Sequence, residues 1–393
     1  GLLLAEWWET PEGKQRFLSE DEAREACGKK YVKKVGKMSK QLRNYRSPQE
    51  IFDNYGADAL RWYFFANQPP WNSIIYSDRA IRESIPEFLL RLWNVYSFFV
   101  IYANIDGFDP AKDFNGPPGQ LESAKLAGGK NYRSVEQRGE LDRWVLSELQ
   151  LMVGKVTECM DAYDNYGACQ SIESFLDGLS NWYVRRSRDR FWAKDRESVD
   201  KSDAYWTLYE CLVTMAKVVA PFVPFVSETI WRNLSGVFGD QTPESVHLCD
   251  YPTANEQWQD DVLSERMALL REVASLGRSA RMEAKLKVRQ PLALVEVILA
   301  SPEHQGWLAD HGKILANELN VKEVAYTQDA EEYINYLVQP NFKRVGPRVG
   351  KLMPKVKKWL NTADGAALLA EVKAKGRGAA EVVGPQIDVG GGE

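Results

Sequence analysis

The sequence has few of the residues that build disulfide frameworks and zinc sites. Its 393 residues include five cysteines and three histidines. An odd number of cysteines without paired spacing argues against a disulfide framework and indicates a reducing compartment, so we expect a cytoplasmic protein. His247, His304 and His311 are too scattered along the chain to build a zinc site. We therefore expect no zinc site in this chain.

Long hydrophobic runs are missing as well. No apolar run approaches the roughly 18 to 20 residues that span a bilayer, and no signal peptide opens the chain. We therefore expect no membrane-spanning segment. The chain starts at Gly1 without an initiator Met and enters an apolar, strand-like run at once. This start suggests a fragment of a longer polypeptide.

Positive charge is not in excess, but it is unevenly distributed. The formal net charge is −5, yet Lys29 to Arg46 holds eight Lys or Arg and no acid. Further basic clusters lie at Arg185–Arg190, Arg278–Arg289 and Lys343–Lys358. Overall acidity with local basic stripes suits a protein that holds a polyanion in a defined orientation. Any single stripe is also explained as solvated surface, where Lys and Arg usually lie.

The chain is longer than one average domain, and its patterns divide it into three parts. Residues 1–66 combine an apolar strand-like start, a basic loop and short helices. Apolar residues at helical spacing predict a helical bundle over 67–240. Residues 260–393 have an α+β pattern and a glycine-rich end that we expect to be frayed. The fold class is therefore mainly α, with a small α+β extension at the carboxyl end.

Local signals give the boundaries of several helices. Ser47, Pro48 and Glu50 form a compact helix start, in which Ser47 caps, Pro48 takes the first helical position and Glu50 completes a capping box. This helix should end at Gly56, and a second short helix should follow over 57–66. Pro86 predicts a kink or a late start in the long helix that opens at residues 77–78.

Lys37-Met38-Ser39-Lys40-Gln41 is the most informative stretch for chemistry. Two lysines flank a serine in a basic loop directly before a capped helix. Such a pair could neutralise a polyphosphate whose charge redistributes during a reaction, and a flexible loop could close after a nucleotide binds. Without further context, a solvated lysine-rich turn is the better explanation of these five residues.

Several motifs in the same order along the chain supply that context. The sequence around Lys37–Gln41, with the segments that follow it, resembles class I aminoacyl-tRNA synthetases, and their isoleucine branch in particular. The similar segments are Leu42–Tyr45, Tyr55–Arg61, Arg61–Phe64, Pro86–Asn94, Ser180–Arg188, Ala220–Phe222, Arg289–Leu292 and Pro340–Lys343 with Gly346, Pro347 and Gly350. The resemblance covers nearly the whole chain and indicates the C-terminal portion of such an enzyme, starting just before the Lys-Met-Ser-Lys-Ser signature.

The resemblance implies roles for particular residues. Lys40 would contact ATP phosphates and stabilise the pyrophosphate, Lys37 would assist, and the backbone of Met38 and Ser39 would lie near adenine. Residues 56–61 would support this loop. Residues 1–66 would be the end of a Rossmann-type catalytic domain, residues 67–240 the anticodon-binding domain, and residues 260–393 the C-terminal extension. The reaction implied is adenylation of isoleucine by ATP with Mg²⁺, followed by transfer to tRNA, in an enzyme that we expect to be a monomer.

Two departures from the family pattern stand out. The fifth signature position is Gln41 in place of the usual Ser. Residues 7–36 separate the apolar strand from the signature by more than a minimal member of the family would have. Ser19 starts a plausible helix within that stretch, so we interpret residues 7–36 as a small surface insertion.

Arginine clusters are the candidates for RNA contact. Arg185 and Arg188 share a helix face, and Arg281 and Arg289 lie in a second basic cluster. Arginine suits phosphate geometry and stacking on bases. Core packing of the neighbouring aromatic residues, or local ion pairs such as one with Glu283, would explain the same residues without RNA.

Two alternatives remain open at this point. A stand-alone helical tRNA-binding module without catalysis would keep Lys37–Gln41 as a relic, and the valine-specific branch would change the substrate but not the class. The residues of this chain do not determine amino-acid specificity, editing, or which side chains read the anticodon.

The first prediction concerns the chain on its own. The His-x-Gly-His signature of the family, most of its nucleotide fold and the amino-acid pocket are absent from these 393 residues. We therefore expect the isolated chain to be unable to adenylate isoleucine. ATP–pyrophosphate exchange measures this step, and exchange above background by the purified chain would contradict the expectation.

Overall fold

The structure is a computed structural model, which describes residues 2–113, 132–299, 301–327, 350–360, 365, 367, 377–380 and 387–390. The chain packs as two compact units, Gly1–Glu265 and Arg266–Glu393, and each is described by itself. The expected strand near 333–338, the segment 340–349 and most of the glycine-rich end lie outside the described residues.

The first unit opens with a small sheet. Strand β1 (Leu3–Glu9) pairs antiparallel with β3 (Val32–Lys37) along one edge. On its other edge β1 pairs parallel with β4 (Ile74–Tyr76) and antiparallel with the short β2 (Arg16–Phe17). Helix α1 (Glu20–Cys27) follows β2, and the hydroxyl of Ser19 caps it by accepting from the Glu22 amide at 3.2 Å.

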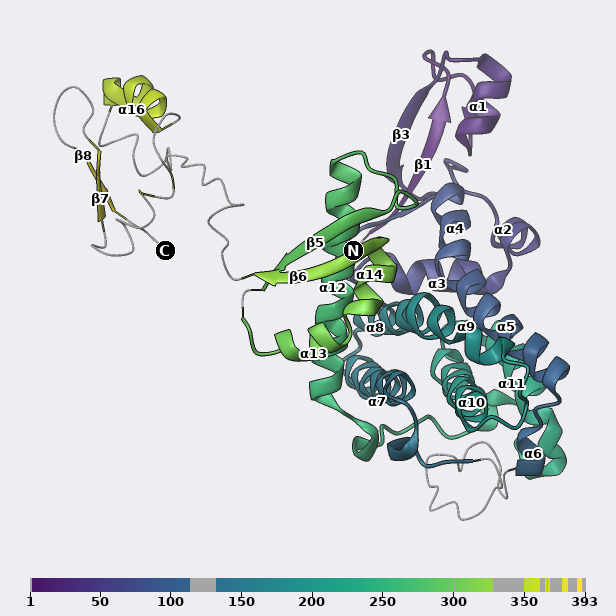
Figure 1. The fold of residues 1–393 in the computed structure, drawn as a ribbon. Helices are drawn as coiled ribbons and strands as arrows, with labels where there is room; N and C mark the ends of the chain where they lie inside the picture. The colour runs from purple at the N-terminus through teal and green to yellow at the C-terminus, as the bar shows by residue number, and fades with distance from the viewer. Residues whose placement is uncertain are drawn as a thin grey trace. The chain divides into compact units, whose positions relative to one another are not determined.

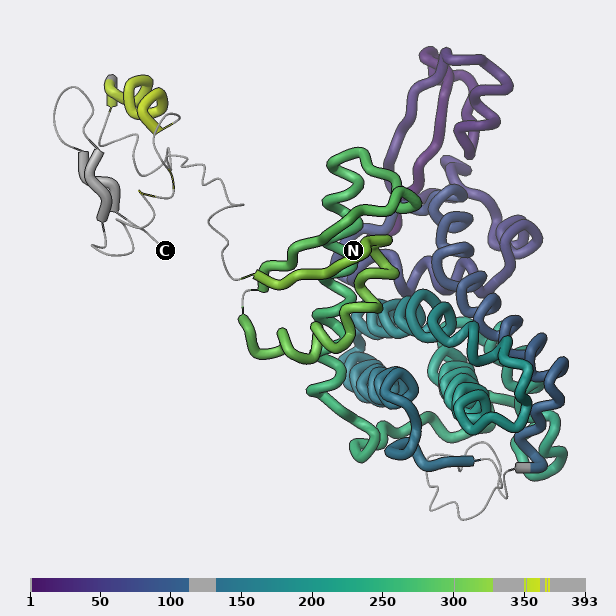
Figure 2. The backbone as a smooth tube through the Cα atoms, viewed as in Figure 1, coloured from purple at the N-terminus to yellow at the C-terminus, as the bar shows by residue number. Residues whose placement is uncertain are grey.

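The segment expected as an insertion, residues 7–36, is therefore an extension of the sheet. Strand β1 continues to Glu9, and the chain returns antiparallel to it as β3 from Val32. Strand β2, which also pairs with β1, and helix α1 lie between β1 and β3 in the sequence. Figures 1 and 2 show the pair of β1 and β3 reaching away from the helices that follow. The sequence alone did not predict the return strand, because Val32–Lys37 has little hydrophobic alternation. We call residues 7–36 the excursion.

The helix signals after the basic loop are confirmed. Helix α2 (Pro48–Tyr55) begins after Ser47, whose hydroxyl accepts from the Glu50 amide at 3.3 Å and donates to the Glu50 carboxylate at 2.9 Å. Gly56 ends it at φ 83°, a conformation that side chains with a Cβ rarely adopt. Helix α3 (Ala57–Ala66) starts at the next residue.

The rest of the first unit is a helical bundle, drawn from blue to green in Figure 1. Its helices are α4 (Asp78–Ser84), α5 (Leu90–Asp106), α6 (Pro110–Asp113), α7 (Glu140–Asp161), α8 (Asn165–Asp177), α9 (Arg185–Trp192), α10 (Val199–Val219) and α11 (Pro224–Ser235). A π-helical turn joins α4 to α5 at Pro86, which confirms the predicted irregularity, and another joins α8 to α9. Helix α10 is buried along almost its whole length, so the other helices pack around it.

Length and composition alone would allow one described helical stretch, Asp78–Asp106, to cross a membrane. This stretch does not stand out as a candidate in the sequence, because Pro86 and several charged residues interrupt its apolar run. Leu92, Val95 and Phe99 of this stretch are buried within the bundle, as expected of a core helix in a globular unit.

One junction connects the sheet-proximal helices to the bundle. The carboxylate of Asp58, in α3, accepts from the Val226 amide at 2.8 Å and the Phe225 amide at 3.4 Å, at the first turn of α11. Arg61, one turn further along α3, donates to the Phe222 carbonyl at 2.9 Å and the Pro221 carbonyl at 2.6 Å. The backbone amides and carbonyls at the break between α10 and α11 therefore find hydrogen-bond partners on α3. Helix ends otherwise leave such groups unpaired.

The second unit mixes helices and strands. Helix α12 (Asp261–Glu283) begins in the first unit and continues into the second. Strands β5 (Leu292–Ile298) and β6 (Val321–Thr327) pair parallel, with α13 (Gln305–Asp310) and α14 (Gly312–Leu319) between them. A Cβ at Gly277 would lie 2.6 Å from the Leu319 side chain, so glycine permits the close approach of α12 and α14.

Further along the second unit the structure describes α16 (Met353–Leu360), β7 (Arg377–Ala380) and β8 (Ile387–Gly390). The last two strands pair antiparallel. The described part of the glycine-rich end is thus a strand pair, where the sequence predicted a frayed tail. Each of these strands contains one glycine, and the hydrogen bonds of a strand ladder use only the backbone.

The junction generates the second prediction. Replacing Asp58, which is 6% exposed, by Ala leaves two amides at the start of α11 without their acceptor. We expect the free energy of unfolding to fall by about 1–3 kcal/mol, the usual cost of unsatisfied buried groups. Thermal unfolding followed by circular dichroism measures it.

Asp53→Ala is the matched control, because Asp53 is exposed on the neighbouring helix α2 and accepts only from Gln49 in the described structure, at 2.8 Å. Equal unfolding temperatures for the two variants would show that the junction does not stabilise the unit.

Candidate functional site

The basic loop leaves the sheet at the end of β3. We call Lys37–Asn44 the signature loop. Lys37 is the last residue of β3 and Lys40 lies in the turn that follows, and both side chains are exposed. Within the part of the chain that the structure describes, neither ammonium group forms an ion pair. Two cations therefore lie close together in sequence with their charge turned to solvent.

A buried asparagine holds the backbone of this loop. Asn44 is fully buried; its side-chain oxygen accepts from the Ser39 amide at 2.9 Å, and its amide nitrogen donates to the Lys37 carbonyl at 3.1 Å. These bonds fix the chain on both sides of Met38. Sequence reasoning did not single out Asn44, although it belongs to the Leu42–Tyr45 segment that resembles the family.

The residues between the two lysines have internal contacts. The Met38 side chain packs against the core that contains Ile51 and Tyr63, and its amide donates to the Leu3 carbonyl at 3.2 Å. The hydroxyl of Ser39 accepts from the Leu42 amide at 3.4 Å. Both residues between the lysines therefore shape the loop.

Arg46 anchors the far end of the loop. Its guanidinium pairs with Glu22 of α1 and with Asp78 at the start of α4, and it lies 3.8 Å from Glu50 of α2. Burial raises the pKa of the Asp78 carboxyl, although the contact with Arg46 opposes this rise. Arg46 thus connects the excursion to α2 and α4.

The arginine cluster of α9 separates into surface and interior residues. Arg185 and Arg188 are exposed, and the Arg185 Nε donates to the Asn181 carbonyl one turn earlier at 3.0 Å. Arg190, from the same basic cluster, points inward and pairs through both terminal nitrogens with Asp142 of α7, at 2.8 and 2.7 Å. It also forms an ion pair with Asp200 at 3.0 Å.

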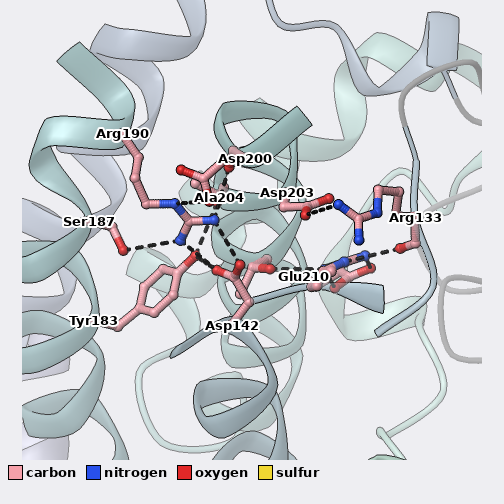
Figure 3. Close-up of polar contacts among 11 residues, drawn as sticks. Arg133, Asp142, Tyr183, Ser187, Arg190, Asp200, Asp203, Ala204 and Glu210 are labelled. Carbon is pink, nitrogen blue, oxygen red and sulfur yellow. Dashed lines mark hydrogen bonds and ion pairs between the residues drawn. The ribbon is translucent and has the colours of Figure 1, made fainter. Parts of the chain in front are cut away.

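Figure 3 shows that this arginine belongs to a polar network inside the bundle. The hydroxyl of Tyr183 donates to Asp142 at 2.7 Å. Burial raises the pKa of the Tyr183 hydroxyl well above its usual value, so it stays a donor. Burial by itself would lower the pKa of Arg190, but the bond to Asp142 outweighs it and the pKa is raised. These bonds fix α9 against α7.

A second pair extends the network toward the residues before α7. Arg138 donates to the Glu210 carboxylate at 2.8 and 3.1 Å and to the Thr207 hydroxyl at 2.9 Å, and Arg133 pairs with Asp203 at 3.1 Å. Figure 3 shows Arg133 beside Asp203. Asp203 and Glu210 both belong to α10. Such buried pairs cost much free energy when one partner is removed. They connect the residues before α7 to α10.

The second basic cluster, Arg278–Arg289, likewise contains both interior and surface arginines. Arg281 is 4% exposed, and its guanidinium donates to the carbonyls of Lys287, Gln290 and Asn320 at 3.0–3.2 Å. It is therefore an internal brace of the second unit, and we correct its assignment as an RNA-binding residue. Arg289 is exposed. Sequence alone could not separate the two, because both lie among other basic residues.

Comparison with known proteins gives these features a context. Residues 142–298 match the family model described as the anticodon-binding domain of tRNA ligase. The isoleucine–tRNA ligase of Dehalococcoides mccartyi strain CBDB1 is 45% identical over 306 residues, which are 78% of this chain and 28% of that protein. The Clostridium acetobutylicum isoleucine–tRNA ligase is 37% identical over 354 residues, 90% of this chain and 32% of that protein.

A solved ternary complex, LeuRS–tRNA–LeuAMS from Agrobacterium radiobacter K84, is 22% identical, with a TM-score of 0.39. The match covers 57% of this chain and 23% of that one, and at this TM-score it supports no argument about the arrangement.

The helical bundle and the matched domain define the chain as part of a tRNA ligase. More narrowly, the chain belongs to the isoleucine–tRNA ligase family of class I aminoacyl-tRNA synthetases. It spans less than a third of the length of these relatives.

Proposed function

We propose that this chain is the C-terminal portion of an enzyme that joins isoleucine to its tRNA at the expense of ATP. In this proposal the signature loop serves the ATP half of the reaction and the helical bundle binds tRNA. The observation that carries it is the pair of exposed lysines on a backbone held by buried Asn44. A stand-alone binding module would have no need for such a loop.

The loop suits charge stabilisation during adenylation. When the isoleucine carboxylate attacks the α-phosphate, the bond to pyrophosphate breaks and negative charge grows on the departing oxygens. A cation that is already in place when that charge develops lowers the barrier most. Lys40, in the turn, would carry this role, Lys37 would assist from the end of β3, and the backbone of Met38 and Ser39 would lie against adenine. Mg²⁺ would arrive with ATP.

The isoleucine specificity rests on the relatives, since the amino-acid pocket lies upstream in the family. Two of the relatives, at 45% and 37% identity, are isoleucine enzymes. The valine branch would share the loop chemistry but would have to bind a side chain smaller by one methylene.

The domain organisation that fits this function has three parts. Residues 1–66 would be the end of the Rossmann-type catalytic domain, residues 67–240 the anticodon-binding domain, and residues 260–393 a C-terminal extension. Arg185, Arg188 and Arg289, all exposed, would contact tRNA phosphates, and we leave Arg281 out. The enzyme would act in the cytoplasm as a monomer.

The third prediction tests the loop in the full-length enzyme. Lys40→Met removes the ammonium group while keeping a long side chain, so the developing pyrophosphate charge loses its partner. By comparison with other preorganised donors, we expect adenylate formation to slow about 100-fold or more. The rate of ATP–pyrophosphate exchange measures adenylate formation.

Lys30→Met is the control, because Lys30 is exposed in the excursion and lies outside the loop. Adenylate formation at the normal rate in the Lys40→Met enzyme would refute the proposed role of the loop.

The fourth prediction tests the bundle surface. Removing one cation that neutralises a phosphate reduces the slope of log K against log salt by about 0.7–0.9. We therefore expect the Arg185→Ala/Arg188→Ala enzyme to bind tRNA more weakly, with a smaller salt dependence, in filter-binding titrations over a range of salt concentrations.

A double variant that removes two other exposed cations, Lys155→Ala/Arg232→Ala, is the matched control. These residues pair with neighbouring acids on their own helices, at 2.9 and 2.6 Å. Unchanged affinity and salt slope in the Arg185/Arg188 variant would exclude this cluster from the tRNA surface.

A further inference from the structure

The excursion contacts the signature loop at Leu42. Arg16, in β2, donates a hydrogen bond from Nη1 to the Leu42 carbonyl. Leu42 lies in the turn, two residues after Lys40, and Asn44 holds the other end of the same turn at Ser39. The stretch that carries Lys40 is therefore held at Ser39 from the loop itself and at Leu42 from the excursion.

The position of Arg16 is fixed by an aromatic ring. Its guanidinium lies over the ring of Trp7, 5.4 Å from the centroid, which is within the range of a cation–π contact. The Trp7 indole nitrogen donates to the Glu9 carboxylate at 3.2 Å, which orients the ring. Arg16 also stands opposite Glu9 in the strand pairing. The arginine is thus supported, although it is exposed.

The same ring lies against the strand that leads into the loop. A Cβ at Gly36 would come within 3.1 Å of the Trp7 ring, closer than side chains normally approach. Gly36 is the residue directly before Lys37. Glycine at this position leaves room for the Trp7 ring, over which Arg16 lies.

A second contact connects the excursion to the chain beyond the loop. Glu22 of α1 pairs with Arg46, which pairs in turn with Asp78. Glu22 is oriented by a bond from the Leu18 amide at 3.1 Å. Burial opposes ionisation of Glu22, but the bonds from Arg46 and the Leu18 amide outweigh it and lower the pKa of the carboxyl. The excursion therefore contacts the chain at two points, at Leu42 within the turn and at Arg46 beyond it.

We propose that the excursion is a clamp on the signature loop, and that Arg16 is a positioning residue for ATP binding. This inference rests on the proposed function of the loop. A loop that samples many conformations binds a ligand more weakly, in proportion to the fraction that is competent. By holding Leu42, Arg16 raises that fraction before ATP arrives and reduces the ordering that binding would otherwise require.

The clamp predicts a particular kinetic change in the full-length enzyme. Without the Arg16 bond, ATP must order the turn itself, which weakens binding in the ground state and the transition state equally. Such a change raises KM and leaves kcat unchanged. We expect Arg16→Ala to raise the KM for ATP about five-fold in ATP–pyrophosphate exchange, as expected when one modest hydrogen bond is removed. Arg16→Lys, which keeps one donor, should raise it less.

Arg24→Ala is the matched control. Arg24 is an exposed arginine of the same excursion, and it forms an ion pair with Glu20 of its own helix, at 3.3 Å. This variant should leave both KM and kcat at the normal values. The Lys40→Met enzyme is measured alongside, because its loss of adenylate formation reports on the proposed function independently of the clamp.

The outcomes separate the two ideas. A raised KM with normal kcat in Arg16→Ala, partly restored in Arg16→Lys, supports the clamp. A normal KM in Arg16→Ala, or a lower kcat at unchanged KM as expected from partial unfolding, overturns it. If Lys40→Met is slow while Arg16→Ala is normal, the loop function stands and only the clamp fails. If both are normal, the proposed function fails and the clamp with it.

Discussion

The contact of α3 with the break between α10 and α11 is the constraint on which the first unit depends. Asp58 accepts from two amides that open α11, and Arg61 donates to two carbonyls that close the preceding turn. Opposite charges on one short helix thus satisfy donors and acceptors that are far away in sequence. The same short helix follows directly on α2 and the signature loop. A shift of the bundle would therefore be transmitted to the helix that supports the loop, and the loop and the bundle form one unit.

Charged residues in this chain fall into two groups with different roles. Arg138, Arg190 and Arg281 are turned inward and bond carboxylates or carbonyls, where removal of one partner would leave a buried charge or a set of unpaired acceptors. Lys37, Lys40, Arg185 and Arg188 are exposed. Within the first unit, Arg190 holds α9, the helix that carries Arg185 and Arg188, against α7.

The excursion extends this principle to the signature loop. Asn44 holds the turn at Ser39. Arg16 contacts the turn at Leu42 and lies over the ring of Trp7, for which Gly36 leaves room, and Glu22 pairs with Arg46 beyond the turn. The excursion is therefore part of the surroundings of the loop.

The local sequence by itself determined the helices that depend on nearby residues. The Ser47–Glu50 cap, the end at Gly56, the irregularity at Pro86 and the apolar stripes of the bundle were all predictable, since each depends on backbone preferences or on periodicity within a few turns. The order of short motifs was likewise sufficient to identify the family, and the lysines of the loop followed from it. The return strand Val32–Lys37 and the strand pair at the glycine-rich end were missed, because backbone pairing with a distant partner leaves little trace in composition.

Only the tertiary structure decided which of several similar residues serve the site. Arg190 lies in the same basic cluster as Arg188, and Arg281 in the same cluster as Arg289, yet one of each pair is internal. Sequence cannot separate them, because burial and hydrogen bonding depend on groups contributed by other helices and loops. The contacts of Asn44 and Arg16 with the loop were not predictable for the same reason, because their partners there are backbone atoms, which any residue type would supply. Residue type and spacing specify helices, whereas the role of a charge is set by what the fold brings next to it.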